Sequence, residues 1–209
     1  MAKKNLLDRS LTSEIDYVFL LYLLREYHFP RNKIQSFLKN KDLIRVKKGL
    51  YVRSDKPYSL GVLANMIYGP SYVSQEFALA RYGMIPERVY HVTSMTIGRR
   101  KEFNTLLGSF YYESIQKDLF SLGLQHVVES PTQSFLIASP EKALIDLIVK
   151  RKDLSSEQDV SDFLIYDLRI DLDSLSLISS KKFKKIASFY TQPVISTLAN
   201  FISKQKKVL

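Results

Sequence analysis

The sequence predicts an α+β protein made of two units, and three observations support that class. Apolar residues recur at helical spacing between residues 15 and 38. They are followed by alternating apolar residues around a Lys47-Lys48-Gly49 turn, a pattern typical of a β-hairpin. Strand-like and helix-like runs then mix along the rest of the 209 residues, of which 45% are hydrophobic. This length suits one or two domains, and the composition supplies a sizeable core.

The first unit is expected to span residues 1–56 and to contain an early helix. Ser13 is a candidate N-cap, with Asp16 three residues later as in a capping box. The apolar residues at helical spacing are Ile15, Val18, Phe19, Tyr22 and Leu23. Because Leu20, Leu21 and Leu24 make this segment apolar nearly all round, we expect the helix to be central to a small core.

A second helix is expected to begin at Pro30, which suits a first helical turn. Ile34, Phe37 and Leu38 form its apolar stripe. The opposite face carries amide, hydroxyl and ammonium groups, on Asn32, Gln35, Ser36 and Lys39. No acidic residue follows until Asp42, so this face is a candidate nucleic-acid contact.

The hairpin, residues 43–55, completes the first unit. Ile44, Val46, Leu50 and Val52 alternate along its strands, and Gly49 supplies a permissive backbone at the turn. Two helices followed by a basic hairpin are typical of a winged helix-turn-helix domain. Asp55-Lys56-Pro57 is the expected linker, so the second unit should span residues 58–209.

The second unit is expected to combine a small sheet with C-terminal helices. Three helices are expected: residues 58–68, residues 74–82 with Ser74 as the cap, and a helix that begins at Pro140 after the N-cap Ser139. The expected strands are residues 72–73, 88–97, 108–115, 125–130 and 134–139. Residues 98–103 are expected to be a basic connection between strands. Two further apolar stripes predict helices near the end: Phe183, Ile186, Ala187 and Tyr190, and Leu198, Phe201 and Ile202.

Positive charge is concentrated in the first unit. The whole chain carries a formal net charge of +10. Residues 1–56 hold 13 Lys and Arg against 6 Asp and Glu, a balance of +7, which leaves +3 for residues 57–209. This distribution favours a polyanion-binding module in front of a nearly neutral body, with a merely basic soluble surface as the alternative.

Several classes of site have no support in the sequence. There is no cysteine, so disulfides, thiolate nucleophiles and Cys-based zinc sites are excluded, and a reducing cytoplasm is expected. The start, Met1 to Lys4, is basic, but no secretory signal follows, and the longest apolar run, Tyr17 to Leu24, is too short to span a membrane. His28, His91 and His126 lack metal-site spacing, and Asp171-Leu172-Asp173 is expected to be an exposed loop or helix start. No phosphate-binding, nucleophile-elbow or metalloprotease motif is present, so no catalytic residue, metal or cofactor is predicted.

The predicted site is a DNA-binding surface. In a winged helix the second helix enters the major groove and the hairpin follows the flanking backbone, so Lys47 and Lys48 are expected near phosphates, while Asn32, Gln35 and Ser36 are expected to read base edges. The full set of predicted DNA-binding residues is Arg31, Asn32, Lys33, Gln35, Ser36, Lys39, Lys41, Arg45, Lys47, Lys48, Tyr51 and Arg53. Arg99, Arg100 and Lys101 are candidate contacts to phosphate or an acidic partner, with a solvated turn as the alternative.

Four segments of the sequence are long enough to compare with a known family: LIRVKKGLYV (43–52), YGPSYVSQEFALARYGMIPERVYHVTSMT (68–96), FNTLLGSFYYESI (103–115) and IASPEKALIDLI (137–148). They resemble the AbiEi-type antitoxins of bacterial type IV toxin–antitoxin systems, also known as abortive-infection transcriptional regulators. The resemblance covers roughly residues 15–150. About two helices precede the hairpin in this sequence, where members of the family often have three.

The resemblance implies an N-terminal winged helix and a C-terminal antitoxin domain. It further implies that the protein represses its own operon by binding double-stranded operator DNA at inverted repeats, in the cytoplasm and as part of phage defence. The functional partner it implies is a nucleotidyltransferase-like toxin, without a stable complex between the two. Two other functions stay open on the residues alone: a transcriptional regulator whose second domain senses a ligand or partner, and a nucleic-acid-processing enzyme.

Overall fold

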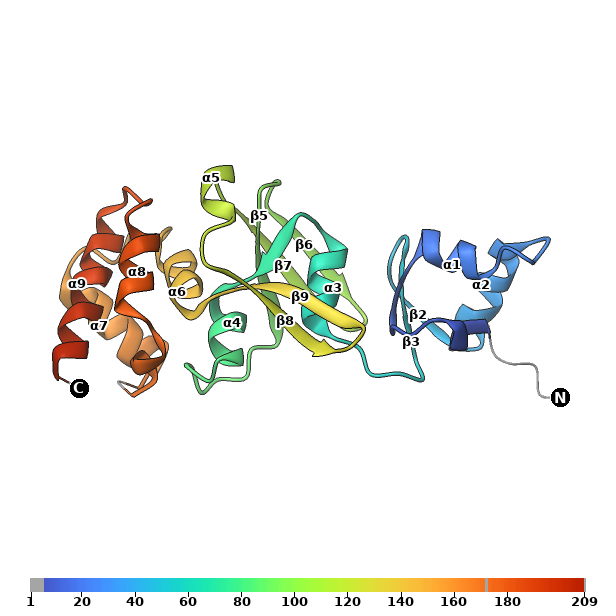
Figure 1. The fold of residues 1–209 in the computed structure, drawn as a ribbon, viewed down its shortest axis with the longest axis horizontal. Coiled ribbons are helices and arrows are strands. Elements are labelled where there is room, and N and C mark those ends of the chain that lie inside the picture. Colours follow the sequence, from blue (N-terminus) through green and yellow to red (C-terminus); the bar gives the residue numbers. More distant parts are fainter. Residues whose placement is uncertain (1–5, 172, 209) are drawn as a thin grey trace.

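A computed structural model shows a mixed α+β chain with two β-sheets and describes residues 6–171 and 173–208. The basic start of the sequence, Met1 to Lys4, and Leu172 of the Asp171–Asp173 segment lie outside the described residues. The elements form successive layers along the long axis (Figure 1). Helices α1 and α2 lie at one end, helices α7 to α9 lie at the other, and the larger sheet lies between them.

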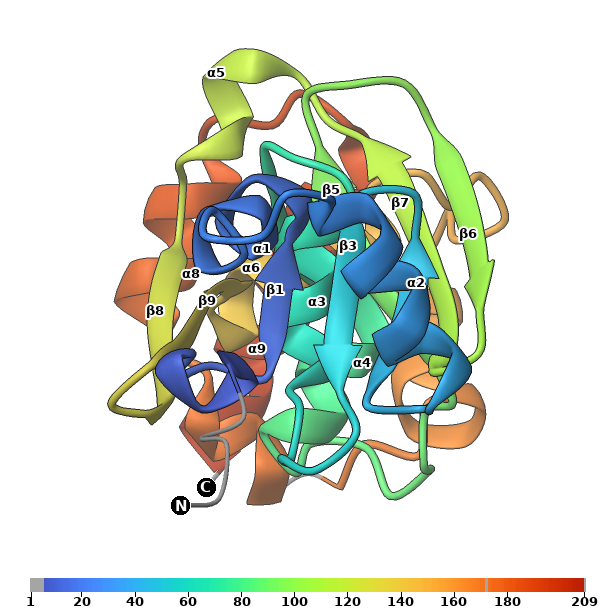
Figure 2. The ribbon, with the colours of Figure 1, turned by 90° about the vertical axis from the view of Figure 1, so that its right-hand side faces the viewer.

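The first layers contain a three-stranded antiparallel sheet in the order β1-β3-β2. The elements up to residue 53 are the 3₁₀ turn η1 (Leu6–Arg9), β1 (Glu14–Asp16), α1 (Tyr17–Leu23), α2 (Pro30–Lys39), β2 (Leu43–Lys47) and β3 (Leu50–Arg53). Figure 2 views this end, with α1 and α2 in front of the sheet. The predicted second helix and hairpin are therefore present, and η1 adds a short helical segment before them.

The start of α1 differs from the prediction. Residues 14–16 form strand β1, and the N-cap is Asp16, whose carboxylate accepts a hydrogen bond from the Phe19 N–H at 2.7 Å. Ser13 is not the cap, because it precedes the strand. The expectation that α1 is central to the core is also wrong for one face, since Val18, Phe19 and Tyr22 are exposed.

A six-stranded mixed sheet forms the middle of the molecule, in the order β6-β7-β5-β4-β9-β8. Its strands are β4 (Ser71–Val73), β5 (His91–Thr96), β6 (Lys101–Thr105), β7 (Gly108–Ser114), β8 (Leu124–Ser130) and β9 (Gln133–Ala138). Strand β6 begins halfway through residues 98–103, which were expected to be only a connection. It pairs with β7 as an edge strand, for example Phe103 with Phe110.

Helices cover both faces of this sheet. Helix α3 (Leu60–Ile67) lies between the two sheets, and α4 (Gln75–Arg81) and α6 (Pro140–Ile148) lie on the opposite side (Figure 1). Ser139 caps α6 as expected, with Pro140 in the first turn. The remaining elements are α5 (Lys117–Phe120), α7 (Glu157–Asp162), the π-helical turn η2 (Phe163–Asp167), the 3₁₀ turn η3 (Asp173–Leu177), α8 (Ser180–Ala187) and α9 (Pro193–Val208).

Two groups of buried apolar side chains stabilise these layers. The smaller group lies between α1, α2 and the three-stranded sheet and includes Leu20, Ile34, Phe37 and Tyr51. The larger group extends through the rest of the chain. Val46, Leu50 and Val52 of the hairpin belong to the larger group, so the outer face of the small sheet is covered by the second unit.

Candidate nucleic-acid interface

A basic groove lies between the start of α1, the start of α2 and the hairpin. It has a volume of about 850 Å³, and it is lined by Tyr17, Arg31, Arg45, Lys48, Gly49 and Tyr51. The Arg31 Nε donates to the Tyr17 hydroxyl at 3.2 Å, and the Arg45 guanidinium lies 5.9 Å from the centre of the Tyr51 ring. Three cationic side chains from separate parts of the sequence therefore meet at one surface.

The tight hairpin turn positions this groove. Lys47 pairs with Leu50, so Lys48 and Gly49 alone form the turn, and Gly49 adopts a positive φ of 86° that suits a residue without a side chain. The Gly49 carbonyl accepts a hydrogen bond from the Tyr17 N–H at 2.8 Å. The tip of the hairpin is thereby fixed against the start of α1.

Helix α2 presents its polar face beside the groove. Pro30 occupies the first helical position, Ile34 and Phe37 are buried, and Arg31, Asn32, Gln35 and Lys39 are exposed. Lys33 and Ser36 are partly buried, and the Lys33 ammonium lies 4.7 Å from the centre of the Phe37 ring. Lys41 is exposed in the loop that follows. Within residues 6–171 and 173–208, no carboxylate forms an ion pair with Arg31, Arg45 or Lys48.

The prediction that Arg53 binds DNA is wrong. Its side chain is only 1% exposed, because β3 directs it into the structure beneath η1. The guanidinium donates to the backbone carbonyls of Leu7 and Ser10 and forms ion pairs with Asp8 and Asp55. The hydrogen bond from Arg53 lowers the pKa of the Asp55 carboxyl, as expected for a paired acid.

Lys47 and Tyr51 also differ from their predicted positions. Lys47 lies on the opposite face of the hairpin from the groove, where its ammonium donates to the Ile67 carbonyl at the end of α3. Burial, with Lys101 as a second cause, lowers the pKa of the Lys47 ammonium. Tyr51 is 4% exposed and lies at the floor of the groove. Of the predicted lysine pair, only Lys48 therefore lines the groove, and Lys47 is partly buried.

The basic segment at residues 99–101 lies apart from the groove. All three side chains are exposed, but Arg100 forms an ion pair with Glu113 at 3.0 Å, and the Lys101 ammonium lies 4.5 Å from the centre of the Tyr68 ring. The structure thus does not add these residues to the surface formed by α2 and Lys48. Tyr17 was not predicted to belong to this surface, because no sequence motif marks it. Only its contact with Arg31 in the structure places it there.

The other side chains considered as candidate sites do not gather at one place among the described residues. The described residues contain no group of three or more His, Asp or Glu side chains placed to hold a metal ion. His28, His91 and His126 are all exposed, and so are Asp171 and Asp173. No described helix is both long and apolar enough to cross a membrane.

Comparisons with known proteins add no family assignment. No protein-family model matches the chain, and a search of curated proteins gives no match to it either.

Proposed function

We propose that residues 1–56 form a winged helix that binds double-stranded DNA. The observation that carries the proposal is the arrangement of α2 and the hairpin around one basic, acid-free groove. The chain order of strand, two helices and hairpin, with sheet order β1-β3-β2, supports the same assignment. In such a domain the second helix enters the major groove.

The exposed residues divide into two roles on this proposal. Asn32 and Gln35 carry amides that donate to and accept from base edges, so they are the candidates for reading sequence. Arg31, Arg45 and Lys48 surround the groove and carry the charge that phosphate contacts need. Phosphate contacts would fix the position of the protein on the duplex, and the amides would supply specificity.

The resemblance to the AbiEi-type antitoxins leads to a proposal about the role of the protein in the cell. The chain would be a type IV antitoxin of the AbiEi type, without catalytic activity, acting in the cytoplasm. It would repress its own operon through inverted repeats and counteract a nucleotidyltransferase-like toxin. The support for this part is the set of four segments that resemble the family, which includes the hairpin and the Ser139-capped start of α6.

Two adjacent lysines provide a matched test of DNA binding. Lys48→Ala should weaken binding to the DNA upstream of the gene and reduce the slope of log affinity against log salt by about 1, because one phosphate contact is lost. Lys47→Ala removes the same charge one residue away but on the face that contacts α3, so its affinity and slope should stay close to wild type at a temperature where the variant is folded. Fluorescence anisotropy over a salt series measures both.

Equal effects of the two substitutions would contradict the assignment of the groove. The absence of any binding by the wild-type chain to its own upstream DNA would contradict the DNA-binding function itself. Metal-dependent cleavage of that DNA would support a nucleic-acid-processing enzyme in its place.

The antitoxin role needs a separate experiment. The nucleotidyltransferase-like toxin that this proposal expects to be encoded beside the gene is expressed from an unrelated promoter, so that repression cannot protect the cells. Growth is then compared with and without the chain. Rescue by the wild type and by the Lys48→Ala variant is expected, because neutralisation and operator binding are proposed to be separate. Failure of the wild-type chain to restore growth would contradict the antitoxin role while leaving DNA binding intact.

A further inference from the structure

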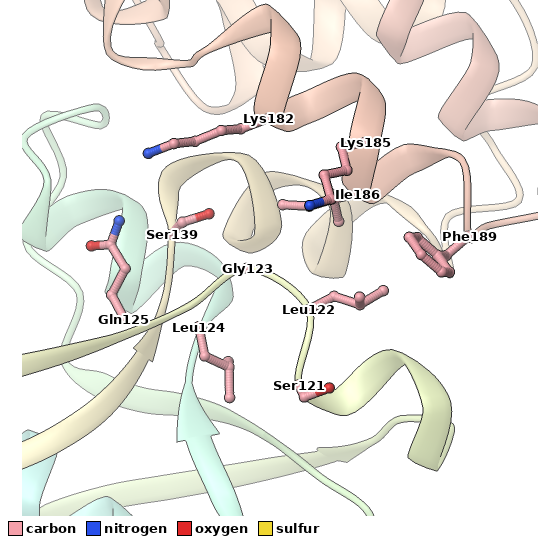
Figure 3. Close-up of a pocket in the computed structure, with 10 residues that line it drawn as sticks. All are labelled: Ser121, Leu122, Gly123, Leu124, Gln125, Ser139, Lys182, Lys185, Ile186 and Phe189. Carbon is pink, nitrogen blue, oxygen red and sulfur yellow. The ribbon is translucent and has the colours of Figure 1, made fainter.

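A second basic cavity lies at the other end of the molecule from the α2 groove. It is formed where α8 and residue Phe189 face the segment that leads into β8, with Ser139 at the start of α6 beside it (Figure 3). Its volume is about 420 Å³, which lies within the range of small-molecule sites in proteins.

The polar side chains of this cavity, which include Ser121, can all donate hydrogen bonds. Lys182 and Lys185 contribute ammonium groups. The Ser139 hydroxyl oxygen already accepts from the Lys142 N–H at 3.4 Å, so its proton remains to donate. Gln125 Oε1 accepts from the Tyr82 hydroxyl at 3.0 Å, and Figure 3 shows the amide nitrogen of Gln125 on the side facing α8.

Negative charge is absent from the lining. None of the ten lining residues is acidic, and no carboxylate of the described chain forms an ion pair with Lys182 or Lys185. Glu141, the next acid along the chain from Ser139, is buried and accepts from the Ser179 N–H at 2.8 Å. Two positive charges among neutral donors therefore fit a ligand group that carries about two negative charges.

The rest of the wall is apolar. Leu122, Leu124 and Ile186 line the cavity, and Phe189 lies at its edge with 55% of its surface exposed. A flat, largely uncharged ring could contact this surface while a charged group lies between the lysines.

The backbone around the cavity is closely packed, which favours a preformed site. Gly123 adopts a positive φ of 63°, and a Cβ atom at this position would lie 2.7 Å from the Ile186 Cδ1. A side chain at position 123 would therefore crowd the Ile186 side chain of α8. Gly123 is also held by a 2.7 Å hydrogen bond from the Ser139 N–H to its carbonyl.

We propose that this cavity binds an organic phosphate of the nucleoside monophosphate class. The phosphate lies between Lys182 and Lys185, within reach of the donors on Ser139 and Gln125. The base lies against the surface formed by Leu122, Leu124 and Phe189. This site is independent of the proposed DNA interface, because it shares no residue with it.

Four lysines on α8 allow a matched test. Lys182 and Lys185 line the cavity, whereas Lys181 and Lys184 are exposed on the same helix and do not line it. Calorimetric titration of the full chain with AMP and with UMP should detect binding of at least one, and adenosine or uridine should bind at least tenfold more weakly. Lys182→Gln with Lys185→Gln should lower the affinity at least tenfold, whereas Lys181→Gln with Lys184→Gln should change it by no more than about twofold.

A third variant tests the apolar wall. Phe189→Ala should weaken nucleotide binding and leave the weak binding of inorganic phosphate unchanged. Absence of binding by wild type to AMP, UMP and inorganic phosphate would overturn the proposal. Equal losses in the two lysine pairs would also overturn it, because they would indicate a diffuse polyanion surface on α8. Loss of DNA binding in the Lys182/Lys185 variant would contradict the independence of the two sites.

Discussion

The pair formed by Lys142 and Asp146 is the most completely buried set of charges in the described chain. The two side chains are fully buried and 2.6 Å apart, and the Asp146 carboxylate also accepts from the Tyr72 and Ser74 hydroxyls at 2.9 and 2.8 Å. The Lys142 ammonium in turn donates to the Tyr190 hydroxyl. Burial raises the pKa of Asp146 and lowers that of Lys142, so each charge depends on its neighbours. The network connects β4, α6 and the segment between α8 and α9.

Removing the charge of Lys142 alone should strongly lower the stability of the protein. Lys142→Met leaves a buried carboxylate without its cation, and we expect a loss of about 3–5 kcal/mol in the free energy of unfolding. Adding Asp146→Asn should restore part of this loss, because a neutral amide still accepts from the two hydroxyls. Urea denaturation of the three variants measures the effect. A double variant no more stable than Lys142→Met would show that the unpaired charge is not the cause.

Arg53 was predicted from the sequence to be a surface residue, but in the structure it stabilises the fold. Arg53→Met should lower the free energy of unfolding by roughly 2–5 kcal/mol, because the carbonyls of Leu7 and Ser10 each lose a buried hydrogen bond from a charged donor. The hydrogen bonds from the Ser10 N–H to the Leu7 carbonyl and from the Lys56 ammonium to the Ser10 carbonyl remain. Arg45→Met is the control on the same hairpin, since Arg45 is exposed and should change stability by less than about 0.5 kcal/mol. Similar unfolding midpoints for the two variants would contradict the structural role of Arg53.

At the scale of elements, periodicity and caps predicted most of what the structure shows. The Ser139-Pro140 start of α6, the hairpin turn at Gly49 and the paired strands β8 and β9 have local signals in the sequence. Strand β1 could not be predicted, because three residues before an apolar helix carry no pattern and pair only with β3, more than 30 residues away. Strand β6 was missed because its basic and polar residues are typical of an exposed connection and also of an edge strand.

The capping box of α7 gives a prediction about acid stability. Asp159 accepts from the Ser155 and Ser156 N–H groups at 2.9 and 2.8 Å, and these hydrogen bonds lower the pKa of its carboxyl to about 2. The contribution to stability should therefore be complete above the ordinary carboxyl pKa of 3.8 and lost as the pH falls towards 2. The melting temperature of Asp159→Ala should lie below that of wild type by a constant amount from pH 5 to 7. The difference should shrink between pH 4 and 2.

Asp171→Ala serves as the control for this measurement. It removes an exposed carboxyl that takes no part in the capping box. A difference between wild type and Asp159→Ala that stays constant down to pH 2 would show that the cap does not depend on the charge of Asp159.

At the scale of the whole molecule, the candidate site could be predicted only in part. The face of α2 was predictable from helical periodicity, because Asn32 and Gln35 lie opposite Ile34 and Phe37 on the helix. The direction in which each hairpin side chain points was not predictable, because a bulge between Arg45 and Lys47 alters the alternation of side chains along β2. That irregularity places Lys47 against α3 and leaves Lys48 at the groove. The boundary between residues 56 and 58 remains a prediction, since the apolar contacts cross it.

These contacts give a prediction about cooperativity. Val46, Leu50 and Val52 of the first unit pack into the core of the second, and the buried Glu14 carboxylate accepts from the Ser59 N–H at 2.6 Å and from Gln133 Nε2 at 3.0 Å. Because both units contribute to one apolar core, the full chain should unfold in a single transition, with equal calorimetric and van't Hoff enthalpies. Glu14→Ala with Val52→Ala removes the polar anchor and part of the apolar contact, and should separate the transition into two. A fragment of residues 58–209 tests the same contacts. It should fold but melt at a lower temperature than the full chain, because the exposed face of α3 loses the hairpin residues that pack against it. Two transitions in the wild-type chain, or an unchanged melting temperature for the fragment, would show that the two units are energetically independent.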